Sequence, residues 1–275
     1  LTSFDSDGFS VGSSDAINDS GNNMVGWNWK AGGTASTNTD GSITSSVSAN
    51  IDSGFSIVTW TGTGANATIG HGLGVVPKIT IIKGREAVTN WIVGGSLIED
   101  VGGSTNNYMI LNGTAAMDTS TTLYASYNTD TIGVKTDANV NGSGQGMVMY
   151  CFAEIKGYSK FDSYIGNGSA DGSFIYTGFK PAFVITKKSS STGNWVMSDT
   201  TRSDVPNANV NDQVLYSNLS NSEESSVGLS IDLVSNGFKI RGNGGDRNAS
   251  GSTYIYMAFA QNPLVGTNNV PATAR

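Results

Sequence analysis

Hydrophobic residues along the chain form short runs that are rich in β-branched and aromatic side chains. Typical runs lie at 55–60, 79–83, 147–152, 183–186 and 254–259. Helical periodicity is nearly absent, because Gly, Ser, Thr and Asn interrupt every window in which a helix could form. Asp-Gly and Asn-Gly pairs separate the runs, and such pairs tolerate the positive φ of tight hairpin turns. Many short strands joined in this way predict an antiparallel all-β fold, a sandwich or a barrel.

The chain repeats its landmark residues at an interval of 104 positions, which aligns 60–64 with 164–168. Six further pairs share the interval: Pro77 and Pro181, Lys83 and Lys187, Trp91 and Trp195, Leu111 and Leu215, Gly133 and Gly237, and Lys135 and Lys239. From Asn141 onward the interval is 107, so we expect a three-residue insertion in the loop 241–246, where extra length costs little. Self-similarity of this kind predicts a tandem array of one module.

The repeat divides most of the chain into two domains of similar size. We expect two antiparallel, jelly-roll-like β-sandwich repeats of about 104 residues, at 51–156 and 157–265, followed by a C-terminal tail at 266–275. Roughly 100 residues is the ordinary size of one sandwich. No flexible stretch separates the two repeats at 154–157, so we expect them to stack at a fixed angle.

Residues 1–50 contain a partial third repeat and a linker. The segments 8–11 and 23–29 resemble late parts of the second repeat, at 237–240 and 253–259. They predict only the closing hairpin of a preceding repeat, followed by a Gly/Ser/Thr-rich linker or edge strand. Because a lone hairpin is marginal in water, we expect this one to pack on a neighbouring chain or on an upstream region.

Composition and charge exclude several classes of function. The 275 residues have a formal net charge of −7, and only 13% are charged, whereas nucleic-acid binding needs a basic surface. No run approaches the ~18 apolar residues of a membrane span. One cysteine, Cys151, excludes an internal disulfide, and one histidine, His71, excludes a site that needs two. The chain begins with Leu1 and has no signal-peptide pattern, so we expect a fragment or a processed product.

Side chains that could catalyse a reaction lack the partners that catalysis needs. His71 lies in a glycine-rich stretch, and no G-x-S-x-G elbow supplies a nucleophile. Glu99-Asp100 and Glu223-Glu224 are sequence neighbours, which point to opposite faces of a strand, whereas glycoside hydrolysis needs two facing carboxyls. We therefore expect loop roles for these residues, and no enzyme, catalytic residue or cofactor.

Two acidic glycine loops, 5–8 and 167–172, offer the oxygen ligands that calcium prefers. Neither has the bidentate Glu that closes an EF-hand, so turn chemistry is the favoured explanation and no metal site is expected. Cys151 lies between two aromatic residues in an apolar run and is expected to be buried and structural.

The tryptophans Trp60, Trp91 and Trp195 lie within the predicted strands, and the last two share a repeat position. Recurrence at equivalent strand positions is what a core requires, so packing is their expected role, with stacking on sugar rings as the alternative. Lys83 and Lys187 are also equivalent, and we expect each where a strand leaves the sheet.

Several long segments carry a family resemblance: 28–33, 70–78, 152–161, 163–172, 176–184 and 193–196. Together they resemble an uncharacterised repeat domain of marine bacteriophage structural proteins. That domain often lies at the C-terminal end of long, tail-fibre-like virion proteins. The resemblance extends from about residue 5 to residue 265. It implies a location on the virion surface rather than an activity, and it supplies no catalytic residues.

Taken together, these observations favour a non-catalytic virion surface protein. It would belong to a tail fibre or similar exposed appendage and act as a β-rich spacer and host-contact module. One alternative is a capsid decoration or filament-forming subunit, completed by inter-chain strand packing. Another is a carbohydrate-binding module that uses loops at one sandwich end, and a glycan-degrading enzyme with facing carboxylates between subunits is the most distant. Expected partners are further copies of the chain, with a trimer as the guess, other virion proteins and a host-surface glycan, without nucleic acid or membrane insertion.

Overall fold

The structure of the chain is a computed structural model, and it describes residues 1–5, 8–202 and 210–261. The chain divides into two compact units, unit 1 up to Lys30 and unit 2 from Ala31 onward. Strands in antiparallel sheets dominate the described residues, so the predicted all-β fold class is confirmed. The expected tail at 266–275 and the end of the second repeat lie outside the described residues.

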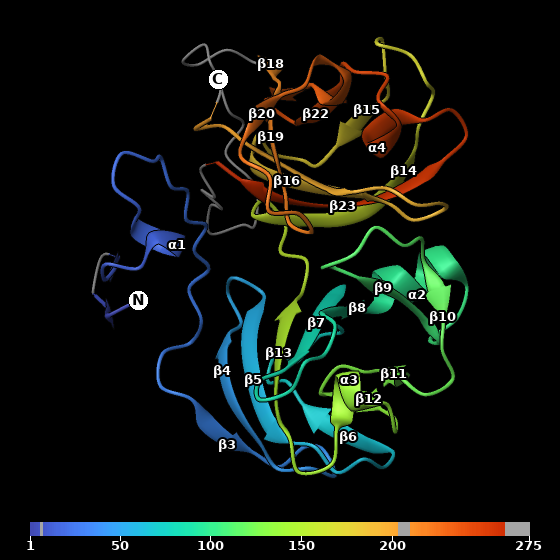
Figure 1. Cartoon of the computed structure of the whole chain (residues 1–275). Helices are drawn as coiled ribbons and strands as arrows, with labels where there is room; N and C mark the ends of the chain where they lie inside the picture. Colours follow the sequence, from blue (N-terminus) through green and yellow to red (C-terminus); the bar gives the residue numbers. More distant parts are fainter. Residues whose placement is uncertain (6–7, 203–209, 262–275) are drawn as a thin grey trace. The chain divides into compact units, whose positions relative to one another are not determined.

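Unit 2 has two halves, which we call lobe 1 (51–156) and lobe 2 (157–261) (Figure 1). The large sheet of lobe 1 is extended by two strands from residues 31–50, β4 and β3, so its eight strands have the order β10-β9-β8-β7-β13-β5-β4-β3. A three-stranded sheet has the order β11-β12-β6. The elements are β3 (Ser36–Asn38), β4 (Ser45–Asn50), β5 (Phe55–Thr61), β6 (Ala67–Gly70), β7 (Ile79–Gly84), β8 (Ile92–Gly94), α2 (Ser96–Gly102), β9 (Asn107–Ile110), β10 (Asp118–Thr119), β11 (Tyr124–Tyr127), β12 (Thr131–Val134), α3 (Ala138–Asn141) and β13 (Gly146–Phe152).

Lobe 2 is built in the same way from a six-stranded and a four-stranded sheet. Their orders are β14-β23-β16-β17-β19-β20 and β15-β22-β21-β18. The elements are β14 (Ser159–Ile165), β15 (Phe174–Tyr176), β16 (Pro181–Lys188), β17 (Trp195–Asp199), β18 (Val210–Asn211), β19 (Gln213–Tyr216), β20 (Glu224–Ser225), the 3-10 helix η1 (Val227–Leu229), β21 (Ile231–Val234), β22 (Gly237–Ile240), α4 (Gly245–Asn248) and β23 (Thr253–Ala260).

The two lobes share one strand order. The run β5-β13-β7-β8-β9-β10 corresponds to β14-β23-β16-β17-β19-β20, and β6-β12-β11 corresponds to β15-β22-β21. In both lobes the chain finishes with a hairpin, a one-turn helix and a long strand that enters the sheet between two earlier strands. We call this stretch the closing segment, at 124–152 in lobe 1 and 231–260 in lobe 2.

The core of each lobe lies between its large and small sheets. Alternation along β13 buries Met147, Met149 and Cys151 against the small sheet of lobe 1. In lobe 2 the equivalent strand buries Tyr254 and Tyr256 in the corresponding cluster. Each lobe therefore has a hydrophobic core of its own, as a self-contained module requires.

The insertion in lobe 2 lies earlier than the sequence indicated. The N–H of Trp91 donates to Asn112 Oδ1 and that of Trp195 donates to Asn218 Oδ1, both at 2.9 Å, so the interval here is already 106. The two hairpins of the small sheets keep this interval. The predicted pairs Leu111–Leu215, Gly133–Gly237 and Lys135–Lys239 are therefore wrong, because identical residue types were matched where hydrogen bonding sets a different register.

The lobes meet without a linker. The ring of Phe152 in lobe 1 lies 6.3 Å from that of Phe161 and 6.0 Å from that of Phe259 in lobe 2. Two backbone bonds of 2.9 Å also cross the junction, from Met117 N–H to Ser189 O and from Gly193 N–H to Thr114 O. Apolar packing and backbone pairing together hold the two modules against each other.

Unit 1 contains β1 (Ser3–Phe4), β2 (Phe9–Ser10) and α1 (Asp15–Asn18). The predicted hairpin between 8–11 and 23–29 does not form, since Phe9 pairs with Phe4 instead. Residues 23–29 form no strand in unit 1. The counterpart strand in each lobe is held by a neighbouring strand on both sides, and the described residues of unit 1 contain no such pair of neighbours. Among the helices of the described residues, none has the length and apolar character needed to cross a membrane.

Candidate functional site

The loop between β14 and β15 is held by one buried asparagine. Asn248, at the end of α4, donates from Nδ2 to Asn167 Oδ1 (3.1 Å), to Ser169 O (2.7 Å) and to Gly242 O (2.9 Å). Its Oδ1 accepts from the N–H of Asn167 at 2.9 Å. Gly168 adopts φ +70° in this loop, where a side chain would be strained. The loop is therefore fixed from within before any ligand binds.

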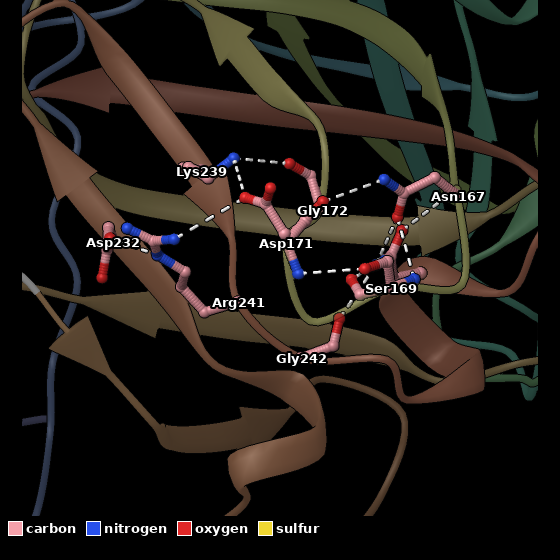
Figure 2. Close-up of polar contacts among 9 residues, drawn as sticks. Asn167, Ser169, Asp171, Gly172, Asp232, Lys239, Arg241 and Gly242 are labelled. Carbon is pink, nitrogen blue, oxygen red and sulfur yellow. Dashed lines mark hydrogen bonds and ion pairs between the residues drawn. The ribbon is translucent and has the colours of Figure 1, made fainter.

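A row of ion pairs lies beside this loop (Figure 2). Lys239 Nζ is 2.8 Å from Asp171 Oδ1 and donates to Gly172 O at 2.8 Å. Arg241 Nη1 is 3.9 Å from the same Asp171 oxygen, and its Nε donates to Asp232 Oδ2. The hydrogen bond from Lys239 and its charge lower the pKa of the exposed Asp171 carboxyl. Two carboxylates thus face two cations, and the charges of this group cancel.

This arrangement disfavours the calcium alternative for the loop 167–172. The ammonium of Lys239 already takes the Asp171 carboxylate and the Gly172 carbonyl, which a calcium ion would need. In the loop 5–8 the Asp5 carboxylate accepts from two serine hydroxyls, while residues 6–7 lie outside the described residues. Within the described ranges, no group of three His, Cys, Asp or Glu side chains could hold a metal.

Exposed aromatic rings border the ion pairs on the outer face of the small sheet of lobe 2. Phe174 pairs with Lys239, which pairs with Asp232, so the three side chains form one row across the strands. Tyr176, two residues along β15, is on the same face and is 65% exposed, and Phe174 is 47% exposed. Asp232 is itself buried, and its Oδ1 has no hydrogen-bond partner in the structure. The face combines flat apolar rings with paired donors and acceptors.

Lobe 1 has no such surface at the equivalent place. The corresponding row there is Thr68, Gly133 and Ser126, without rings or charges. A preceding loop also pairs with β6, through hydrogen bonds between Ser42 and Thr68 and a bridge from Ile43. The aromatic and charged face is therefore specific to lobe 2, and we call it the lobe 2 face (Phe174, Tyr176, Asp171, Asp232, Lys239 and Arg241).

His71 has a structural environment, in agreement with its expected loop role. It is fully buried, its Nε2 lies 3.2 Å from Asn128 O, and its Nδ1 accepts from the N–H of Leu73 at 3.3 Å. Burial lowers the pKa of the imidazole, which favours the neutral form. Both ring nitrogens are thus engaged by the backbone, so the ring holds the loop after β6 in place.

The adjacent carboxylates do not face each other across a groove. Asp100 forms an ion pair with Lys78 at 3.1 Å, and Glu99 lies beside it in α2, which is a helix rather than the expected loop. Glu223 pairs with Arg202, while Glu224 lies in β20 and accepts from the hydroxyl of Tyr216. Asp100, Glu223 and Glu224 are therefore each engaged by a local partner.

A hollow of about 340 Å³ lies where the lobes meet, lined in part by Lys78, Asp100, Glu154, Lys160 and Asp162. Lys160 Nζ is 3.1 Å from Glu154 and 3.6 Å from Asp162, so cations and carboxylates are already paired here. The hollow is therefore a polar part of the interface between the lobes.

The remaining predicted residues have packing roles. Cys151 is fully buried, and burial raises the pKa of its thiol to about 12. Trp60 belongs to the core of lobe 1, the ring of Trp91 stacks on that of Tyr150 at 6.4 Å, and Trp195 Nε1 donates to Ile110 O across the junction.

Lys83 and Lys187 lie at the ends of β7 and β16, as expected for residues where a strand leaves the sheet. Lys187 is buried, and its Nζ donates to Thr114 O, Ala115 O and Lys188 O, so it binds lobe 2 to a loop of lobe 1.

Sequence reasoning missed the lobe 2 face and the buried Arg247. Arg247 takes the place of Val140 in the repeat and is fully buried, with its guanidinium bound to Thr186, Ser198 and Leu229 O. A comparison of the two repeats at corrected register would have found both, because Asp232, Lys239 and Arg247 appear in lobe 2 where lobe 1 has Ser126, Gly133 and Val140.

Comparison with known proteins gives one match. A family model described as a domain of unknown function (DUF7483) matches residues 1–263. No curated protein and no solved structure matches the chain.

Proposed function

The chain belongs to the DUF7483 family, a domain of unknown function, and we propose that it is a non-catalytic component of a phage virion surface. It would act as a β-rich spacer and host-contact module of a tail fibre or similar exposed appendage. The observation that carries this proposal is the direct junction between two modules of the same strand order. Modules that stack through packed junctions build length while each keeps its own core.

The chemistry of the described residues supports a role without catalysis. Asp100 and Glu223 are paired with cations, Glu224 accepts from a hydroxyl, His71 is engaged by backbone groups, and Cys151 is buried. A nucleophile, a general base and a site for a reacting atom have to converge in an enzyme. The groups described here are distributed over separate places in both lobes.

Location on the particle tests this proposal. Antibodies raised against the chain would be used to label purified phage particles for electron microscopy, with particles lacking the protein as the control. We expect label on the tail or on an appendage. Label over the head would favour the alternative of a capsid decoration subunit, and absence from the particle would contradict both.

A second candidate function, carbohydrate binding, is favoured by the lobe 2 face. Exposed rings such as Tyr176 and Phe174 stack on the apolar face of a pyranose, and carboxylates and guanidinium groups bond its hydroxyls. Because the two carboxylates and two cations neutralise each other, a neutral sugar fits without breaking an ion pair. The ligand class is therefore a neutral glycan.

Binding of a neutral glycan is tested with a glycan array, followed by calorimetry on any positive sugar. Tyr176→Ala and Arg241→Ala should each weaken binding about fivefold, consistent with the ~1 kcal/mol of one ring contact or hydrogen bond. Ser126→Ala, at the equivalent place of lobe 1, is the matched control and should leave affinity unchanged. An array without a single positive sugar would reject this function.

The expected partners are further copies of the chain and other virion proteins. We propose a homo-oligomer, with a trimer as the specific expectation, because fibre-like appendages are assembled from repeated copies. Sedimentation equilibrium at micromolar concentration measures the mass, and a stable monomer would contradict the proposal.

A further inference from the structure

Unit 1 reproduces the closing segment of the lobes in its hydrogen bonding. In lobe 1 the hairpin pairs Tyr127 with Ile132, and in unit 1 it pairs Phe4 with Phe9, at an interval of 123 residues for both. A one-turn helix follows in each case, α3 in lobe 1 and α1 in unit 1, at the same interval. Unit 1 therefore holds the hairpin and the helical turn of a module.

An asparagine fixes the helical turn in all three places. Asn18, Asn141 and Asn248 each end their helix, and each bonds from its backbone N–H to the carbonyl four residues earlier. Each also donates from Nδ2 to the carbonyl six residues earlier, at 2.8, 3.3 and 2.9 Å respectively. A glycine with positive φ follows three residues later in every copy: Gly21, Gly144 and Gly251. Such agreement in geometry identifies one structural element in three copies.

Side chains that fill the core of lobe 1 are exposed in unit 1. Four equivalent positions in lobe 1 are at most 9% exposed: Tyr127, Ile132, Val140 and Met147. Their counterparts in unit 1 are 39–82% exposed: Phe4, Phe9, Ile17 and Met24. An element that carries core side chains without a core needs a surface to cover them.

The two lobes show which kind of surface covers these side chains. The central strand β13 pairs with β5 along one edge and with β7 along the other, and β23 is held in the same way by β14 and β16. Residues 23–29 occupy the equivalent place in unit 1. Both lobes of unit 2 already contain their own central strand, so neither they nor a second copy of the chain offers this place.

We propose that unit 1 is the closing segment of a third β-module, and that its partner is a lobe-type β-module with an open central position. Residues 23–29 enter the partner's sheet between the counterparts of β5 and β7. Phe4, Phe9, Ile17 and Met24 then fill the core between its two sheets. This inference is independent of the proposed location on a virion.

Polar residues in unit 1 fit such a partner. At the interval of 123, Asn28 corresponds to Cys151, which is paired with Ser56 on β5 and Thr80 on β7. In lobe 1 Ser56 is fully buried, and the polar group that its side chain meets is the weakly bonding thiol of Cys151. An amide at this place can bond the hydroxyls on both sides, so a partner with Ser or Thr at these two positions accommodates Asn28.

The test gives unit 1 the partner that the proposal specifies. A second copy of residues 51–123, the part of lobe 1 before its closing segment, is fused directly in front of Leu1 in the full chain. Hydrogen exchange of the amides of residues 23–29 is then followed by mass spectrometry in the fused and the original chain. We expect exchange at least 100-fold slower in the fusion, because these amides become the central strand.

Two matched variants calibrate the fusion. The double variant Phe9→Asp, Asn18→Ala should lose the protection, and a fusion that carries residues 124–152 in place of 1–29 should gain it. If the fusion with residues 124–152 is protected from exchange and the fusion with the natural unit 1 is not, the proposal is wrong. Slow exchange at 23–29 in the original chain as a monomer would also overturn it, and concentration-dependent protection would assign the place to a second copy. Fast exchange in the original chain, at all concentrations, supports it even where neither fusion folds.

Discussion

Replacement of Asn248 by alanine tests whether the repeated asparagine is a main determinant of each module. The side chain is fully buried and joins the end of α4 to two separate stretches of lobe 2, the loop after β14 and the segment after β22. The variant removes one amide and leaves Ser169 O, Gly242 O and Asn167 N–H without that partner. No smaller side chain at this position can restore the three bonds.

The expected loss follows from the number of bonds. A hydrogen bond contributes about 1 kcal/mol, and a buried group left unpaired costs about 1–3 kcal/mol. With three backbone groups affected and some access of water to the loop, we expect the free energy of unfolding to fall by about 3–4 kcal/mol. Domains are stable by only about 5–15 kcal/mol, so this loss is large enough to separate the unfolding of lobe 2 from that of lobe 1.

Urea unfolding, followed by the fluorescence of Trp60 and Trp91 in lobe 1 and of Trp195 in lobe 2, measures the effect. Asn141→Ala should cost lobe 1 a similar amount, because Asn141 bonds Ala65 O (2.6 Å), Thr63 and Lys135 in the same way. Asn18→Ala should cost less than about 0.5 kcal/mol, since that residue is exposed and its surface partner can bond water. Losses below 1 kcal/mol at both buried sites would refute the reasoning.

Three further predictions concern titratable side chains. Burial lowers the pKa of His71, so the folded state binds fewer protons than the unfolded state, and stability should be lost as pH falls through about 6.5. Thermal melts from pH 8 to pH 5 measure this loss, and a dependence of the melting temperature on pH that is unchanged in His71→Gln would contradict the prediction. Burial lowers the pKa of Lys187 to about 8, against about 10.4 in the unfolded chain, so the free energy of unfolding should rise as the pH rises from about 8 to about 10.4. In urea titrations at these pH values, Lys187→Met should not show the rise. With its pKa raised to about 12, native Cys151 should not react with a thiol reagent at pH 8, and rapid labelling without unfolding would show that the strand is not closed.

Much of the fold could be predicted from the chain, because its short β-branched and aromatic runs are separated by turn residues. The predicted run 147–152 lies within β13, and 254–259 lies within β23. The pairing of the strands was harder to predict, because it depends on which strand edges have no other partner in the folded chain. The N-terminal hairpin shows this: Phe9 pairs with Phe4, a nearby partner that carried no signal from the repeat.

The lobe 2 face could not be predicted, because its residues are distant in sequence and meet only through strand register. Asp171 and Lys239 lie 68 positions apart and are brought together by the pairing of β15 with β22. The calcium alternative for the loop 167–172 rested on its acidic composition, which cannot indicate that a lysine from another strand neutralises it. The net charge at a site depends on all the residues that lie close together in the folded chain, and not only on those of one sequence motif.

The two equivalent lysines explain why the junction between modules has a direction. Lys187 reaches across to the carbonyls of Thr114 and Ala115 in lobe 1, and the N–H of Gly193 also bonds Thr114 O. Thr89 takes the place of Gly193 in lobe 1, and its carbonyl and hydroxyl bind the ammonium of Lys83 at 2.7 and 3.0 Å, with Ala87 O at 3.3 Å. Lys83 could bind a further module in the same manner only if it gave up these three bonds. Lys83 is therefore bound within its own lobe, whereas two of the three bonds of Lys187 cross the junction, and this difference gives the junction its direction.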